Sequence, residues 1–133
     1  MTRINVVPVQ ELQREHLVAE YKEIVRVFAL ARSAQYELHK KKIPNEYTLG
    51  TGHVLYFYDK LKYITERYNS LCTEMKHRGY VCNRVDQSEL EQGIDRSLFW
   101  NYIPTNAALA LNRARISERL ADSAAKKLLK EKK

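Results

Sequence analysis

No proline or glycine interrupts the chain between Leu12 and His39, and the apolar residues within that stretch recur at three- and four-residue steps. The recurring set consists of Leu17, Tyr21, Ile24, Val25 and Phe28. Such spacing marks one face of an α-helix, in which successive residues turn by about 100°. The stretch therefore predicts one long helix that buries this face in a core.

The opposite side of this predicted helix is polar. His16, Glu20, Glu23 and Arg26 gather there, with Lys22 at the edge. One interpretation is a solvated helix surface with weak ion pairs, each contributing about 0.3 to 0.5 kcal/mol. The other is a carboxylate within a phosphate-binding patch, where the cations hold a nucleic-acid backbone and the carboxylate acts on a sugar. The residues alone favour the first interpretation.

Turn-forming residues mark the next segment, residues 40–58, as an irregular loop. They are Pro44, Asn45, Gly50 and Gly52. The last residues of the segment, 54–58, are apolar enough to pack against the core.

A second helix is predicted after this loop. Its helically spaced apolar residues are Leu61, Ile64, Tyr68, Leu71, Cys72 and Met75. We expect Asp59 to cap its start and Gly79 to end it. Residues 80–102 show no sustained period, so we expect a loop there with at most a short helical turn.

A third helix is expected to open at Pro104 and Thr105. It carries two apolar rows, with Asn112, Arg115 and Arg119 in a line between them. The lysine-rich tail, at about residues 124–133, either extends this helix or frays. We therefore predict an all-α fold, a single compact domain of three main helices with long irregular loops over residues 1–133.

Composition narrows the classes of partner. The chain has 133 residues and a hydrophobic fraction of 44%, enough for one core. Lys and Arg number 23 against 16 Asp and Glu, and the resulting net charge of +7 favours a polyanion such as nucleic acid. The apolar runs are too short to cross a bilayer and residues 1–5 lack a signal-peptide core, so we expect an intracellular protein with no membrane contact.

Several common catalytic signatures do not occur in the sequence. It has no phosphate-binding Walker loop, no dinucleotide fingerprint, no Gly-x-Ser-x-Gly elbow and no His-Glu-x-x-His pair. The four histidines are scattered, and Cys72 and Cys82 lack the paired spacing of a zinc site. We therefore expect no bound metal and two reduced cysteines that serve packing.

A series of short motifs resembles the pyrimidine-dimer DNA glycosylase family, the phage-type endonuclease V family, in the same order over most of the chain. The motifs are MTRIN at residues 1–5, HLVAEYKE at 16–23, RVF at 26–28, GTGHV at 50–54, FYDKL at 57–61, KHRGY at 76–80, YIP at 102–104 and AR at 114–115. The family is all-helical with three main helices, in agreement with the periodicity. The resemblance implies an enzyme of base excision repair, intracellular and of phage, viral or bacterial type.

The resemblance also implies a chemistry. In the family the initiator methionine is removed, and the exposed amine of the next residue, here Thr2, attacks the sugar carbon that bears the damaged base. An α-amino group has a pKa of about 7.7 to 8.0, so a useful fraction is uncharged at neutral pH. Glu23 matches the family's essential carboxylate. The resulting imine permits strand cleavage by β-elimination, and neither metal nor cofactor is implied.

Further positions match family residues that face DNA. Arg3, His16, Arg26, Arg115 and Arg119 match cationic positions at phosphates and the lesion, although each is equally well explained as a surface cation. Lys22 stands where the family usually has arginine, so we expect a weaker hold on phosphate. His53 lies in the glycine-rich loop, where a DNA contact and a structural role are equally expected.

The expected partner is damaged double-stranded DNA, bound by a monomer. The tail from residue 124 lacks the aromatic residues of the phage prototype, so dimers, ring-opened purines and abasic sites all remain open as favoured lesions. Two alternatives differ in class. A non-catalytic helical DNA-binding protein would need neither Thr2 nor Glu23, and a basic RNA-associated protein is supported only by charge and tyrosines.

Overall fold

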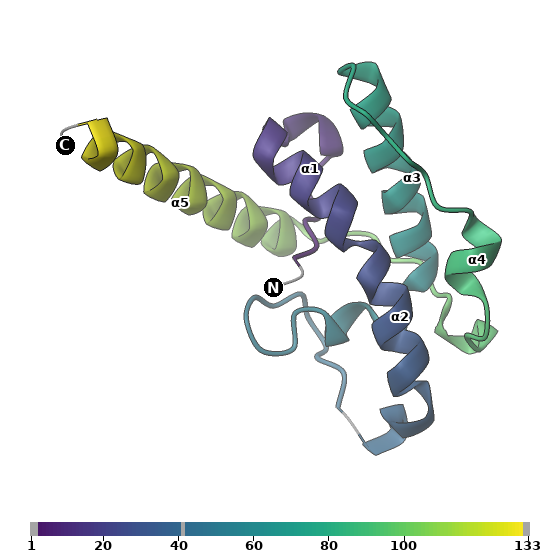
Figure 1. The fold of residues 1–133 in the computed structure, drawn as a ribbon. Coiled ribbons are helices and arrows are strands. Elements are labelled where there is room, and N and C mark those ends of the chain that lie inside the picture. The colour runs from purple at the N-terminus through teal and green to yellow at the C-terminus, as the bar shows by residue number, and fades with distance from the viewer. Residues whose placement is uncertain (1–2, 41, 132–133) are drawn as a thin grey trace.

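The computed structural model of the chain describes residues 3–40 and 42–131. Its α-helices are α1 (Arg14–Glu23), α2 (Val25–Ala34), α3 (Leu61–His77), α4 (Gln87–Glu91) and α5 (Asn106–Glu131). Short 3-10 helices lie at Val9–Glu11, Gln35–Lys40, Leu55–Phe57 and Arg96–Leu98. Within these residues the one extended pairing is an isolated bridge between Lys60 and Phe99. The all-α prediction is confirmed (Figure 1).

The first predicted helix is present, but it is divided at Ile24. This residue keeps helical dihedral angles, with φ −59° and ψ −32°. Its N–H donates to the carbonyl of Glu20 at 2.8 Å, whereas the N–H of Val27 donates to the carbonyl of Ile24 at 3.1 Å. A three-residue bond thus replaces a four-residue bond and tightens one turn. Because Ile24 keeps helical dihedral angles, α2 follows directly on α1 in space (Figure 1).

The two ends of α3 differ in how well the sequence predicted them. Asp59 does not cap the start: Lys60 holds the N-cap position, and the Asp59 carboxylate accepts from Lys60 Nζ at 2.9 Å. The chain is still turning there, because the Lys60 N–H donates to the carbonyl of Phe57. At the other end Gly79, with φ +79°, follows the last turn, and the Tyr80 N–H donates to the carbonyl of Met75 at 2.9 Å. The predicted glycine stop is confirmed.

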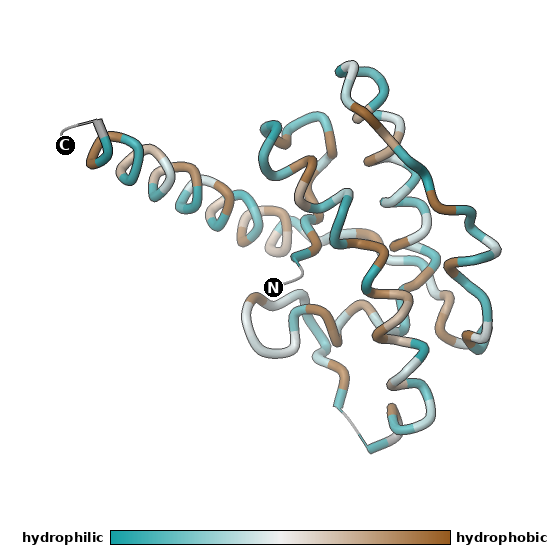
Figure 2. Tube along the Cα trace, viewed as in Figure 1, coloured by the Kyte–Doolittle hydropathy of each residue, from teal (hydrophilic) through white to brown (hydrophobic). Residues whose placement is uncertain are grey.

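Helix α5 begins in the core and ends away from it. Thr105 Oγ1 accepts from the Ala108 N–H at 3.1 Å and so caps the first turn, as predicted. Ala108 and Asn112 are buried, whereas residues 121–130 are all exposed. Figure 1 shows the later turns projecting from the rest of the molecule, and in Figure 2 hydrophilic and hydrophobic residues alternate along them.

Residues 4–7 run through the interior, although the sequence assigned them to no element. Ile4 and Val7 are fully buried, and they join a core built from buried residues of every long helix. In the helical part of the chain, including the 3-10 helix Leu55–Phe57, the largest fully buried apolar side chains are Leu17, Ile24, Phe28, Phe57, Leu61, Ile64 and Leu71. Among the described helices, none is both long enough and apolar enough to cross a membrane.

Candidate active-site groove

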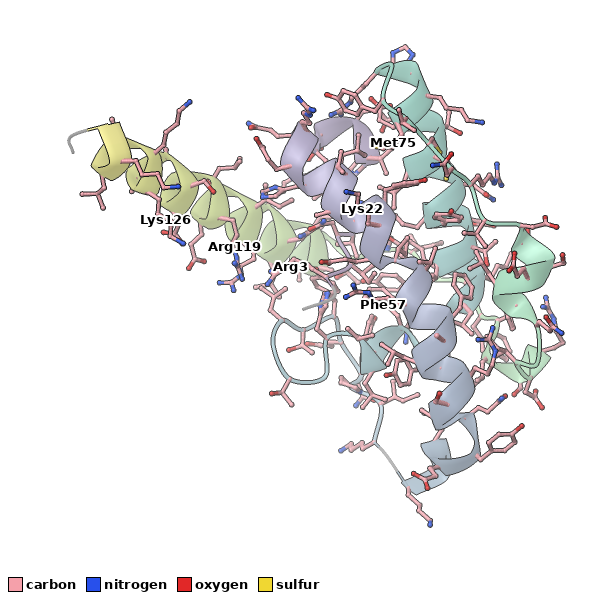
Figure 3. The ribbon with its side chains drawn as sticks, in the orientation of Figure 1. Arg3, Lys22, Phe57, Met75, Arg119 and Lys126 are labelled. Carbon is pink, nitrogen blue, oxygen red and sulfur yellow. The ribbon has the colours of Figure 1, made fainter. Side chains whose placement is uncertain are left out.

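A groove of about 490 Å³ lies where the N-terminal segment, α1 and α5 meet. Five of the predicted site residues line it, namely Arg3, His16, Glu23, Arg115 and Arg119. The other lining residues are Asn5, Glu15, Ala19, Glu20, Ile116, Asp122, Ser123 and Lys126. In Figure 3, Arg3 lies where α1 and α5 approach each other, and Arg119 and Lys126 follow along α5.

Helical spacing explains why the two helices each supply a row of side chains to this groove. On α1, His16, Ala19 and Glu23 are separated by three and four residues, so they share one face. On α5, Arg115, Arg119 and the more distant Lys126 share a face by the same rule. The α1 wall of the groove therefore carries carboxylates, Glu23 among them, and the α5 wall carries three cations together with Asp122.

The Glu23 carboxylate is bound to the backbone of the N-terminal segment. Its Oε2 accepts from the Arg3 N–H at 3.3 Å, and the side chain is half-buried. The Arg3 amide nitrogen belongs to the peptide bond that joins Arg3 to Thr2, so three covalent bonds separate it from the Thr2 amino nitrogen. Thr2 itself lies outside the described residues.

Three buried nitrogens in the groove have no hydrogen-bond partner among the described residues. They are Arg3 Nη1, His16 Nδ1 and Arg115 Nε. Buried polar atoms in folded proteins almost always have a partner, so each such exception calls for an explanation. All three belong to the lining of one groove, and two are guanidinium donors. This arrangement is typical of a site whose acceptors come from an anionic ligand.

Burial and neighbouring cations lower the pKa of two groove residues, Arg3 and His16. The pKa of Arg3 is lowered by burial and by the nearby Arg119 and Arg115. Burial likewise lowers the pKa of His16, and Arg3 and Arg119 add to this effect while Glu15 opposes it. A bound anion would relieve this repulsion, because opposite charge favours the protonated form of each group.

Lys22 and Arg26 do not line the groove. They lie on an adjoining surface of α1 and α2 that also includes Arg14 and Glu23. Both are exposed. Glu23 therefore stands at the border between the groove and a second cationic surface, and Figure 3 shows Lys22 on the outer side of α1.

His53 is buried and lies away from the groove lining. Its Nε2 accepts from the Ile4 N–H at 2.8 Å, and its Nδ1 is 2.8 Å from the carbonyl oxygen of Thr48. The proton therefore sits on Nδ1, which donates to that carbonyl. Burial lowers the pKa of His53 and favours this neutral form. Both ring nitrogens are engaged in hydrogen bonds within the protein. The geometry therefore favours a structural role for His53 over a DNA contact.

Glu20 was predicted among the exposed polar residues of the first helix, and this prediction is wrong. Only 2% of its surface is exposed. Its carboxylate forms a buried ion pair with Arg67, with distances of 2.8 and 3.0 Å, and accepts from Asn5 Nδ2 at 2.8 Å. A signal existed, because Arg67 stands within the apolar row of α3 between Ile64 and Leu71, where a buried cation needs a counterion.

Asn112 is a further buried polar residue whose role the sequence did not reveal. It is fully buried, and its Oδ1 accepts from the N–H groups of Val6 and Val7 at 2.7 and 3.2 Å. Its Nδ2 donates to Asn5 Oδ1 at 2.9 Å. The only sequence signal was its position on the helix between the apolar residues Leu109 and Ile116.

Comparison with known protein families relates the chain to a family of DNA repair enzymes. The family model described as pyrimidine dimer DNA glycosylase matches residues 1–88. The matched part contains the N-terminal segment, α1 and Glu23, whereas the groove cations of α5 lie beyond it. Within the described part of the chain, no group of three or more His, Cys, Asp or Glu side chains could hold a metal ion.

Proposed function

Because the chain belongs to the pyrimidine dimer DNA glycosylase family, we propose that it both removes a base at the lesion and cleaves the resulting abasic strand. Family membership makes it a DNA repair glycosylase with DNA as its substrate. The observation that carries the finer proposal is the bond from the Arg3 N–H to the Glu23 carboxylate. It ties a carboxylate to the backbone beside Thr2, in a groove that also holds unpartnered cationic donors.

The nucleophile in this proposal is the α-amine of Thr2 after removal of Met1. The small threonine side chain favours that removal. An α-amine is far less basic than lysine, so it provides an uncharged nitrogen at neutral pH without a separate base. The nitrogen attacks C1′, the bond from C1′ to the base breaks, and the base leaves with a proton.

Strand cleavage follows from the covalent intermediate. Opening of the sugar ring breaks the C1′–O4′ bond and produces an imine between C1′ and the protein nitrogen. The imine withdraws electrons and makes the C2′ proton removable, after which the C3′–O bond breaks and the 3′ phosphate leaves. Glu23 stabilises the cationic sugar before the imine forms and assists the proton transfers.

DNA is held by two surfaces in this proposal. Arg3, His16, Arg115 and Arg119 contact phosphates within the groove, and Lys22 and Arg26 contact them on the adjoining surface. Access to C1′ requires a bent duplex and an extruded nucleotide, which in this family is the base opposite the dimer. All groove residues come from one chain, so a monomer supplies the complete site.

Glu23→Gln tests the assignment of the carboxylate, and Glu66→Gln on the exposed face of α3 is its matched control. Substrates are duplexes with a single pyrimidine dimer or a single abasic site, with borohydride present or absent. With borohydride present, the wild type should form a trapped protein–DNA complex on the abasic duplex. Without borohydride it should cleave the lesion-bearing strand of each duplex, at the lesion only. Glu23→Gln should lower strand cleavage by about 100-fold or more while trapping persists.

The control variant should cleave within about two-fold of the wild-type rate, because Glu66 is remote from the groove. Cleavage by Glu23→Gln at the wild-type rate would remove Glu23 from the mechanism. Absence of any trapped complex with the wild type would reject the imine, and a non-catalytic DNA-binding protein would then explain the groove.

A further inference from the structure

The backbone of residues 4–7 is held by side chains rather than by a helix or a sheet. The Ile4 N–H donates to His53 Nε2 at 2.8 Å, and the Ile4 carbonyl accepts from the Tyr47 hydroxyl at 3.1 Å. The N–H groups of Val6 and Val7 both donate to Asn112 Oδ1. The Val7 carbonyl accepts from Arg67 Nη1. Side chains from residues 47–53, α3 and α5 thus satisfy the hydrogen-bonding groups of one buried segment.

These contacts fix the register of residues 4–7, that is, their lengthwise position relative to the side chains that bind them. In a sheet, a ladder of backbone bonds would set that register, but here it depends on a few side-chain atoms. The segment continues directly into Arg3, whose amide is bound to Glu23. A shift of residues 4–7 along the chain would therefore move the Arg3 amide, and the residue attached to it, relative to the groove.

Asn112 also joins this segment to the cationic wall. Arg115 and Arg119 follow it on α5 by three and seven residues, so they lie on adjacent parts of the same helix face. Through Asn5, Asn112 is linked to the buried pair of Glu20 and Arg67. Helix α5 thus positions both the groove cations Arg115 and Arg119 and the backbone of residues 4–7, which leads to the Arg3 amide bound to Glu23.

We propose that Tyr47 and Asn112 are positioning residues that set the register of the N-terminal segment, and with it the distance from the nucleophile to the sugar. This inference rests on the proposed function, since it concerns the placement of the Thr2 amine. Covalent catalysis needs the reacting atoms about 3 to 3.5 Å apart, and a displacement of about 1 Å can lower the rate by roughly 100-fold. Neither residue lines the groove and both are buried, so we expect neither to contact DNA.

Tyr47→Phe is the mildest test of this inference. It removes the hydroxyl that donates to Ile4, while the ring keeps its edge-on packing against His53, Tyr56 and Phe57. Tyr68→Phe is the matched control, because the Tyr68 hydroxyl accepts from a backbone N–H, that of Val85, remote from the N-terminal segment.

Asn112→Ala is the stronger test, since it leaves the N–H groups of Val6 and Val7 without their acceptor. Its control for lost stability is Leu71→Ala, a fully buried core position of α3. All assays are run at a temperature at which circular dichroism shows each variant folded. Should Asn112→Ala fail to fold, Tyr47→Phe and its control decide the question.

Two quantities are measured for each variant. One is the single-turnover rate of borohydride-trapped complex formation on a natural abasic duplex, with enzyme in excess. The other is the Kd for a duplex that contains a tetrahydrofuran site, which cannot form an imine. We expect trapping to slow about 10-fold in Tyr47→Phe and about 100-fold in Asn112→Ala, with each Kd within about three-fold of wild type. The controls should leave both quantities within about two-fold.

A lost rate with unchanged Kd is the result that a merely structural role would not produce. Wild-type trapping rates in folded Tyr47→Phe and Asn112→Ala would overturn the inference, as would a loss of affinity that accounts for the slower rate. If the wild type itself gives no trapped complex, the proposed function fails instead, so the two failures are distinguishable.

Discussion

His53 shows at the scale of a single residue how a buried titratable group supports the N-terminal segment. Its two ring nitrogens bond to the Ile4 N–H and the Thr48 carbonyl, and this arrangement requires the neutral ring. Burial lowers its pKa below the ordinary value of about 6.5. His16 is affected in the same direction.

This pKa shift predicts an acid-sensitive fold. Below a pH of about 6.5 the unfolded chain binds protons that the folded chain does not. The free energy of unfolding therefore decreases as the pH decreases, until the lowered pKa is reached. The loss is at most about 1.4 kcal/mol per pH unit for each histidine. Urea unfolding at a pH of about 7.5 and of about 5.5 measures it.

His53→Gln is the informative variant for that measurement, because an amide oxygen can still accept from the Ile4 N–H but does not titrate. It should lose less stability on acidification than the wild type does. His77→Gln, at the exposed end of α3, is its control and should behave as the wild type. A wild-type free energy of unfolding that stays constant or rises on acidification would contradict the account.

Individual residues differed in how far the sequence could place them. Helical spacing correctly put His16 and Glu23 on one side of α1 because that argument needs only the angle per residue. It could not tell that Glu20, on the same side, is covered by the N-terminal segment and α3. Burial of a polar residue depends on which distant segment packs over it, and local periodicity carries no such information.

At the scale of the element, α5 places two neighbouring arginines in different surroundings. Arg115 lines the groove with an unpartnered Nε, whereas Arg113 lies elsewhere and is paired with Glu11 at 2.8 Å. Two residues along a helix correspond to a rotation of about 200°, so the two side chains point to different sides. Each can be changed without moving the other.

Arg115→Gln should therefore weaken DNA binding, and Arg113→Gln should not. Loss of one phosphate contact lowers affinity for the tetrahydrofuran duplex and reduces the slope of log K against log salt by about one. Fluorescence anisotropy between about 50 and 200 mM salt measures both effects. Equal salt slopes for the two variants would show that the groove does not bind phosphate at Arg115.

The three main helical stretches were predictable because each has a sustained apolar period, and α3 also has a recognisable end at Gly79. The short helix α4 has no such period, so at most a short helical turn was expected there. Two local details were not predictable. The division at Ile24 arises from one tightened turn, and the start of α3 is displaced from Asp59 by the 3-10 turn before it. Residues 4–7 form no regular element, so periodicity could not place them in the core.

At the scale of the whole molecule, the site depends on contacts between parts of the chain that are far apart in sequence. Asn112 on α5 holds Val6 and Val7, and Glu23 on α1 holds Arg3. The family match ends at residue 88, so the helix that supplies the cationic wall lies beyond it. The N-terminal segment and α5 together bring Arg3, Arg115, Arg119 and Lys126 to this groove, where four Asp and Glu side chains also lie.

The central claim is that the backbone nitrogen of Thr2 becomes bonded to deoxyribose, and mass spectrometry of the trapped complex tests it most directly. The wild-type protein is incubated with abasic duplex and borohydride, the complex is digested with nuclease and protease, and the modified peptide is sequenced. The account predicts a sugar remnant on the α-nitrogen of Thr2, in a peptide that lacks Met1. A remnant on a lysine side chain, or strand cleavage by protein that retains Met1, would contradict it.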